Sequence, residues 1–138
     1  MNASLSSYAV GYVAAAVAML ALDAVWLTMT ANALYRPMIG ELMLDGFRLA
    51  PAAVFYVLYL CGVVFFAIHP ALATGRWTTA LLSGALLGLL AFGTYDLTNQ
   101  ATLKVWPLTL TLADMGWGCF LTAVSATAGY FAASALAK

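Results

Sequence analysis

Three aspartates, Asp23, Asp96 and Asp114, lie inside or at the ends of long apolar stretches of this chain. On insertion scales, an aspartate at the centre of a membrane helix raises the free energy of insertion by about 2.5–3.5 kcal/mol, whereas each Leu or Phe lowers it by only about 0.3–0.6 kcal/mol. Carboxylates in such stretches are therefore rare, and they usually face a bundle interior or a wet cavity. A carboxyl group in apolar surroundings holds its proton more tightly, so it can serve as a general acid or base near neutral pH. We therefore interpret the three aspartates as candidate catalytic residues.

Aromatic and amide side chains accompany these aspartates at helical spacing. Trp26 follows Asp23 by three residues, and Trp117 follows Asp114 by the same interval, so each pair shares one helix face. Asp96 lies in the polar run TYDLTNQAT. The candidate ligand-binding residues are Trp26, Tyr95, Asn99, Trp106 and Trp117.

Simpler interpretations of the same residues stay open. The tryptophans are also suited to anchoring helices at the membrane interface. The carboxylates could equally be solvated by lipid headgroups or form structural ion pairs with Arg36, Arg48 or Lys104.

The composition indicates which elements must position these side chains. Of the 138 residues, 65% are hydrophobic and 7% are charged, and the five basic and five acidic residues cancel. A soluble domain carries about a quarter charged residues, so we exclude a soluble globular domain, a disordered chain and a nucleic-acid-binding protein. The single histidine and the two cysteines, which lie in apolar runs, indicate neither a metal site nor a cofactor.

The fold class predicted from this composition is all-α, an integral membrane bundle of four transmembrane helices forming one domain over residues 1–138. About 20 apolar residues are needed to cross a bilayer as a helix, and four stretches meet that length: about 7–29, 51–69, 78–97 and 108–135. Residues 31–50 form an amphipathic connection that either extends the first helix or lies in the membrane interface.

An even number of spans predicts both termini on the same side of the membrane. The two long loops hold Arg36, Arg48 and Lys104, against Arg76 and Lys138 on the terminal side. The excess of positive charge on the loops favours termini outside the cytoplasm.

Because helix direction alternates along the chain, the three aspartates are all expected toward the long-loop side. A stripe of small residues at intervals of four, Gly118, Thr122 and Ala126, follows Asp114, and Gly84 and Gly88 form a GxxxG pair. Small residues allow membrane helices to approach closely. Asp114 is therefore expected on a packing face and not against lipid.

The segments LDAVWL, TYDLTNQATLKVWP and DMGWG, in this order, resemble the small bacterial membrane proteins of domain-of-unknown-function family 2177. The resemblance covers essentially the whole chain and implies a multi-pass protein of the bacterial inner (cytoplasmic) membrane. It also implies a set of important positions: Asp23, Trp26, Tyr95, Asp96, Asn99, Trp106, Pro107, Asp114 and Trp117. It implies no reaction, because the family has no assigned activity.

Three functions are compatible with these features. The first is an interface-level cavity, lined by Asp, Trp and Tyr, that binds or modifies an amphipathic lipid-like small molecule. The alternatives are a small proton-coupled transporter and a non-catalytic accessory subunit of a membrane complex. The expected partners are membrane lipids and such a ligand, with no nucleic acid, and both a homo-oligomer and a larger complex stay open. Whether the protein is an enzyme is also open.

Overall fold

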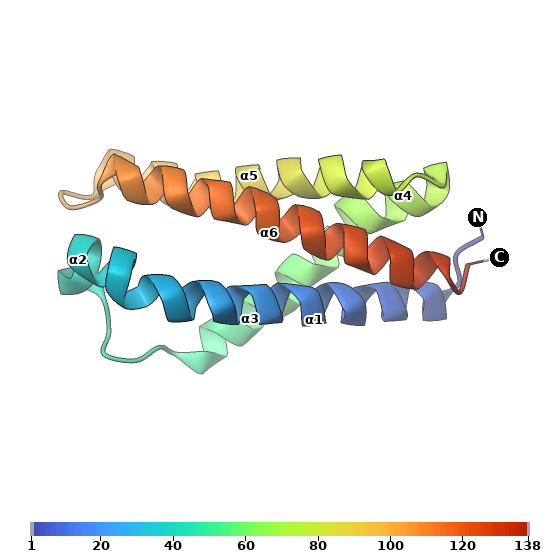
Figure 1. Cartoon of the computed structure of the whole chain (residues 1–138), viewed down its shortest axis with the longest axis horizontal. Coiled ribbons are helices and arrows are strands. Elements are labelled where there is room, and N and C mark those ends of the chain that lie inside the picture. Colours follow the sequence, from blue (N-terminus) through green and yellow to red (C-terminus); the bar gives the residue numbers. More distant parts are fainter. Residues whose placement is uncertain (1, 138) are drawn as a thin grey trace.

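The computed structural model describes residues 2–137, and over these residues the protein is helical with no strands. Four continuous helical stretches are long and apolar enough to cross a membrane: Leu5–Leu42, Leu49–Thr74, Trp77–Thr102 and Leu108–Ser134. The predicted fold class is confirmed. Figure 1 shows both ends of the chain at one end of the bundle and the two longer connections at the other. Lys138, which entered the comparison of loop charges, lies outside the described residues.

The first span is longer than its predicted apolar stretch. It begins with α1 (Leu5–Thr30), whose N-terminus is closed by a capping box between Ser4 and Ser7, and continues through the π-helical turn η1 (Ala31–Tyr35). The short helix α2 (Arg36–Ile39) and the 3-10 turn η2 (Gly40–Leu42) complete it. Most of the amphipathic segment thus extends the first helix, and only residues 43–48 form a non-helical connection.

The second span also passes through a proline. It consists of α3 (Leu49–Val63), the π-helical turn η3 (Val64–Ile68) and α4 (His69–Thr74). Pro37 and Pro70 each stand two residues after the end of a π turn. A proline cannot donate the usual backbone hydrogen bond and collides with the preceding turn, and the wider hydrogen-bond register of a π turn accommodates it. The helix therefore continues beyond the predicted end at 69.

The third and fourth spans, α5 (Trp77–Thr102) and α6 (Leu108–Ser134), pack closely against each other. A Cβ added to Gly88 would lie 2.1 Å from the carbonyl oxygen of Gly118, and one added to Gly84 would lie 2.8 Å from that of Thr122. The predicted small-residue faces thus form the α5–α6 interface, where the absence of side chains lets the backbones approach.

The apolar core occupies the middle of the bundle and the half that contains the termini. α1 packs against α6, and the second span slants behind both helices toward α5 (Figure 1). The largest fully buried apolar side chains of this core are Met19, Val63, Ile68, Leu72 and Leu121. Toward the long-loop end the buried side chains become polar and include Asp96, Thr111 and Asp114, and the candidate site lies there.

Candidate functional site

Asp23, on α1, receives two hydrogen bonds from other helices. The indole Nε1 of Trp117, on α6, donates to Oδ1 at 2.9 Å. The hydroxyl of Tyr56, on α3, donates to Oδ2. Both carboxyl oxygens of Asp23 therefore accept a hydrogen bond from a neutral donor, so neither is left unsatisfied inside the bundle.

Asp114, on α6, is held by a chain of two donors that comes from the first span. Trp26 donates from Nε1 to the hydroxyl oxygen of Tyr35 at 3.1 Å, and the Tyr35 hydroxyl donates to Oδ1 of Asp114. Tyr35 is the last residue of the π turn η1. The extension of the first helix beyond Thr30 thus delivers this donor to the site.

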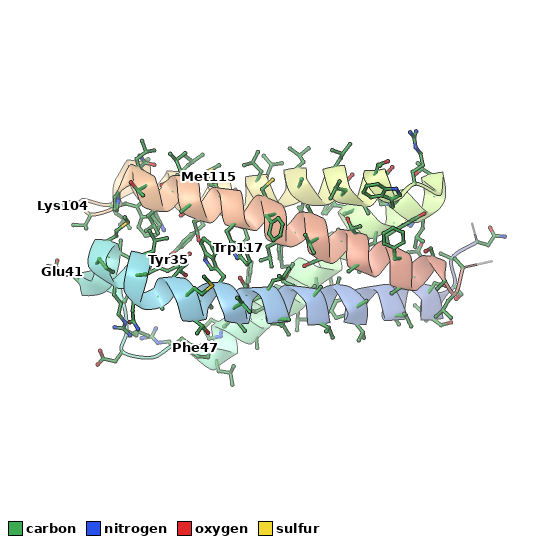
Figure 2. All side chains as sticks on the ribbon, in the orientation of Figure 1. Tyr35, Glu41, Phe47, Lys104, Met115 and Trp117 are labelled. Carbon is green, nitrogen blue, oxygen red and sulfur yellow. The ribbon has the colours of Figure 1, made fainter. Side chains whose placement is uncertain are left out.

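The two Asp-x-x-Trp pairs interlock across α1 and α6. The rings of Trp26 and Trp117 stack with centroids 4.5 Å apart and an interplanar angle of 6°. Three residues advance a helix by about 4.5 Å, so in two antiparallel helices the Asp of each pair lies level with the Trp of the other. Figure 2 shows Tyr35 and Trp117 in the space between the first span and α6. The equal spacing of the two pairs therefore produces a crossed network between α1 and α6, formed by the stack of Trp26 on Trp117 and the hydrogen bond from Trp117 to Asp23.

Asp96, on α5, is fully buried, with 0% of its surface exposed. Among residues 2–137, neither of its carboxyl oxygens has a hydrogen-bond donor. Its carboxyl group instead faces that of Asp114, with which it interacts electrostatically. The alternative in which lipid headgroups solvate Asp96 is wrong, because the residue is fully buried and α5 continues past it to Thr102.

A pocket of about 190 Å³ lies between α1, α3 and α6 and is lined by Asp23 and Asp114. The other lining side chains are apolar or aromatic: Trp26, Leu27, Tyr35, Phe55, Tyr56, Phe92 and Trp117. A second pocket of about 310 Å³ shares Phe55, Phe92 and Asp114 with the first and adds Ala91 and Tyr95. Phe55 is 49% and Tyr95 55% exposed, so the second pocket lies at the outer surface between α3 and α5.

Two of the candidate ligand-binding residues lie beside the pockets and not in their walls. The ring of Trp106 meets that of Tyr95 edge to face, with centroids 5.4 Å apart, and its Nε1 donates to Thr111 at 3.2 Å. Trp106 thus fixes the connection before α6 and supports Tyr95. Asn99 is half-buried on α5, outside the lining of both pockets.

Four aromatic residues of the site were not among the candidates: Tyr35, Phe55, Tyr56 and Phe92. Tyr56 carried one signal, since a tyrosine inside an apolar stretch needs a partner for its hydroxyl. The contribution of Tyr35 depends on the extension of the first helix, which the sequence left open. The two phenylalanines are indistinguishable from ordinary lipid-facing residues in the sequence.

The partners found for Asp23 and Asp114 are phenol and indole groups, whereas ion pairs had been an open alternative. Arg36, Arg48 and Lys104 are all exposed, and Arg36 donates to the backbone carbonyl of Asp45 at 3.4 Å. A site with two carboxylates at its wall, one more behind it and aromatic rings around it can hold a positive charge or exchange a proton with a ligand.

Comparison with known proteins adds one finding. A family model described as "Predicted membrane protein (DUF2177)" matches residues 8–131. No curated protein and no solved structure matches the chain.

Proposed function

This chain belongs to the DUF2177 family of predicted membrane proteins, and we propose that it binds or modifies an amphipathic lipid-like small molecule. It is a multi-pass membrane protein with four candidate spans. We further propose that it resides in the bacterial inner membrane, with its polar site toward the side of the two longer loops.

The observation that carries this proposal is the pairing of a polar pocket with an apolar one that reaches the outer surface. The inner pocket offers the carboxylates of Asp23 and Asp114, and the outer one has walls of Phe55, Phe92 and Tyr95. A ligand with a polar end and an apolar chain would satisfy both, because its chain would reach lipid between α3 and α5. Ligand sites of this kind combine mostly apolar walls with a few convergent polar groups.

Asp114 is the carboxyl group best placed to exchange a proton with such a ligand. It lies at the wall of both pockets and receives one hydrogen bond, from Tyr35. Asp23 has a donor on each oxygen, so its role is to hold Trp117 and Tyr56 in place. Any acid–base step on the ligand would therefore run through Asp114, with Asp96 behind it.

The proposal is tested by comparing the membrane lipids of a host that carries the natural protein with those of a host that carries Asp114→Asn. The matched control is Asp45→Asn, which makes the same chemical change at an exposed residue of the connection 43–48. We expect one amphipathic species to change in amount with the natural protein and with the control variant, but not with Asp114→Asn. Identical lipid profiles in all hosts, together with no amphipath retained on the purified protein, would refute the proposal.

Proton-coupled transport is the second candidate, and the buried Asp96–Asp114 pair is the observation that favours it. Transport predicts proton-dependent flux of the amphipath across liposome membranes. Binding or modification predicts no such flux.

A further inference from the structure

The site combines three carboxyl groups with a wall that contains no cation. No Lys or Arg is among the residues that line either pocket. Asp23 has two neutral donors and Asp114 has one, whereas Asp96 has none within the described part of the chain and is fully buried. An unpartnered buried carboxyl is costly. The site therefore lacks a positive group that its ligand could supply.

Asp96 and Asp114 face each other because the α5–α6 register brings them together. The same antiparallel register places Gly84 against Ala126, Gly88 against Thr122 and Phe92 against Gly118. One turn further toward the long-loop end it places Asp96 against Asp114. Two adjacent carboxylates in a protein interior do not both carry charge without a cation. Without a bound cation the pair is therefore expected to share one proton, which Asp96 can donate to Asp114 as a hydrogen bond.

The other titratable groups around this pair are tyrosines. Tyr35 of η1 and Tyr95 of α5 are close enough to interact electrostatically with both carboxyl groups. The hydroxyl of Tyr56, on α3, donates its hydrogen bond to Asp23. A proton exchanged at this site therefore belongs to the carboxyl pair, because an ordinary phenol holds its proton to about pH 10.

The remaining walls favour an ammonium group. Six of the nine residues around the inner pocket carry aromatic rings: Trp26, Tyr35, Phe55, Tyr56, Phe92 and Trp117. Aromatic faces attract cations, and this attraction grows when water is excluded. Negative charge behind a wall of aromatic rings is the arrangement that recognises alkylated ammonium ions.

We infer that the ligand carries a cationic ammonium headgroup on its apolar chain, and that its binding displaces the proton shared by Asp96 and Asp114. The inference rests on the proposed function and names the chemical class of its ligand. No covalent bond forms or breaks in the ligand. The ammonium nitrogen keeps its charge, the proton leaves a carboxyl oxygen for bulk water, and the net charge of the site is the same before and after.

The experiment measures the binding of two amphipaths to the full chain in nanodiscs over a range of pH. The probes are dodecyltrimethylammonium, which is cationic at every pH, and dodecanol, which has the same chain and no charge. Release of one proton per bound cation predicts that the Kd for the ammonium probe falls about tenfold for each unit of rising pH while the pair holds its proton. The pH change of a weakly buffered solution on binding gives an independent count of the protons released per bound cation. Binding of dodecanol is expected to be independent of pH.

Two variants separate this role from a merely structural one. Asp96→Asn keeps the size of the side chain and provides an amide donor for Asp114, but it removes the exchangeable proton. We expect the pH dependence and the proton release to disappear, while binding of dodecanol persists. Asp45→Asn, at an exposed position, is expected to behave like the natural protein.

The possible results are distinguishable. Loss of the pH dependence in Asp96→Asn alone supports the inference. Equal binding of both probes, or binding of the ammonium without proton release, overturns it and leaves the proposed function standing. Failure of both probes to bind overturns the proposed function, and the inference with it.

Discussion

Replacing Gly118 by alanine tests whether the α5–α6 contact positions the wall of both pockets. The added methyl carbon would lie 2.2 Å from Cγ and 2.3 Å from Cδ2 of Phe92. Carbon atoms pack at about 3.5–4.0 Å, so the Phe92 ring would have to move by about 1.5 Å. Overpacking of this kind costs about 1–3 kcal/mol. The ring lines both pockets, so its movement would also change the shape of the site.

Gly116→Ala on the same helix is the matched control. A Cβ at Gly116 meets no atom within 4 Å, so this variant receives only the benefit of replacing a helical glycine, about 0.5–1 kcal/mol. Gly118→Ala receives the same benefit, so the difference between the two free energies of unfolding isolates the collision. We expect Gly118→Ala to be the less stable by about 1–3 kcal/mol when both are unfolded in mixed detergent micelles. Equal stability of the two variants would refute the packing argument.

Three further predictions concern the polar network. Tyr56→Phe removes one of the two donors to Asp23, so unfolding in detergent is expected to show a loss of about 1–3 kcal/mol; stability equal to that of the natural protein would mean that the hydroxyl is dispensable. Trp26→Leu removes the stack on Trp117 and the hydrogen bond that Trp26 donates to Tyr35. Beyond the lost apolar area, the expected loss of stability is about 0.5–1.5 kcal/mol for the stack and about 0.5–1.5 kcal/mol for the hydrogen bond. The coupled indole signal in near-ultraviolet circular dichroism is also expected to disappear; survival of that signal would assign it elsewhere. Asp114→Asn keeps an acceptor oxygen but no titrating group, so we expect a folded protein without activity, and unchanged activity in lipid analysis would make the residue structural.

Much of the fold follows from hydropathy, because spans of apolar residues and the cost of burying charge leave few arrangements in a bilayer. The small-residue faces were predictable for the same reason, since Gly84, Gly88 and Gly118 stand at helical intervals and close packing needs them. The identical spacing in the two Asp-x-x-Trp pairs indicated a common face, but the crossed network also required α1 and α6 to be antiparallel neighbours.

The two π turns were not predictable from these patterns. A proline in an apolar stretch ordinarily ends a helix, so Pro37 and Pro70 favoured helix ends. Both helices continue because a π turn precedes each proline. The hydrogen bond from Tyr35 to Asp114 depends on this continuation.

The burial of Asp96 was also hidden from the sequence. The polar run that follows it suggests a helix end, yet α5 continues to Thr102. Threonines in the run bond to the backbone of the preceding turn, as Thr94 does to Leu90 at 2.7 Å and Thr102 to Thr98 at 2.8 Å. Hydroxyl groups satisfied within their own helix tolerate an apolar environment, so these residues do not force the chain into water.

Photo-crosslinking tests most directly whether the two pockets form one site for an amphipath. The probe is an alkyltrimethylammonium with a diazirine in its chain, applied to the protein in nanodiscs, and the labelled residues are mapped by mass spectrometry. We predict labels on Phe55, Phe92 and Tyr95, which line the outer pocket, and their reduction by an excess of unlabelled amphipath. Labels spread evenly over the lipid-facing residues of all four spans, without competition, would contradict the proposal.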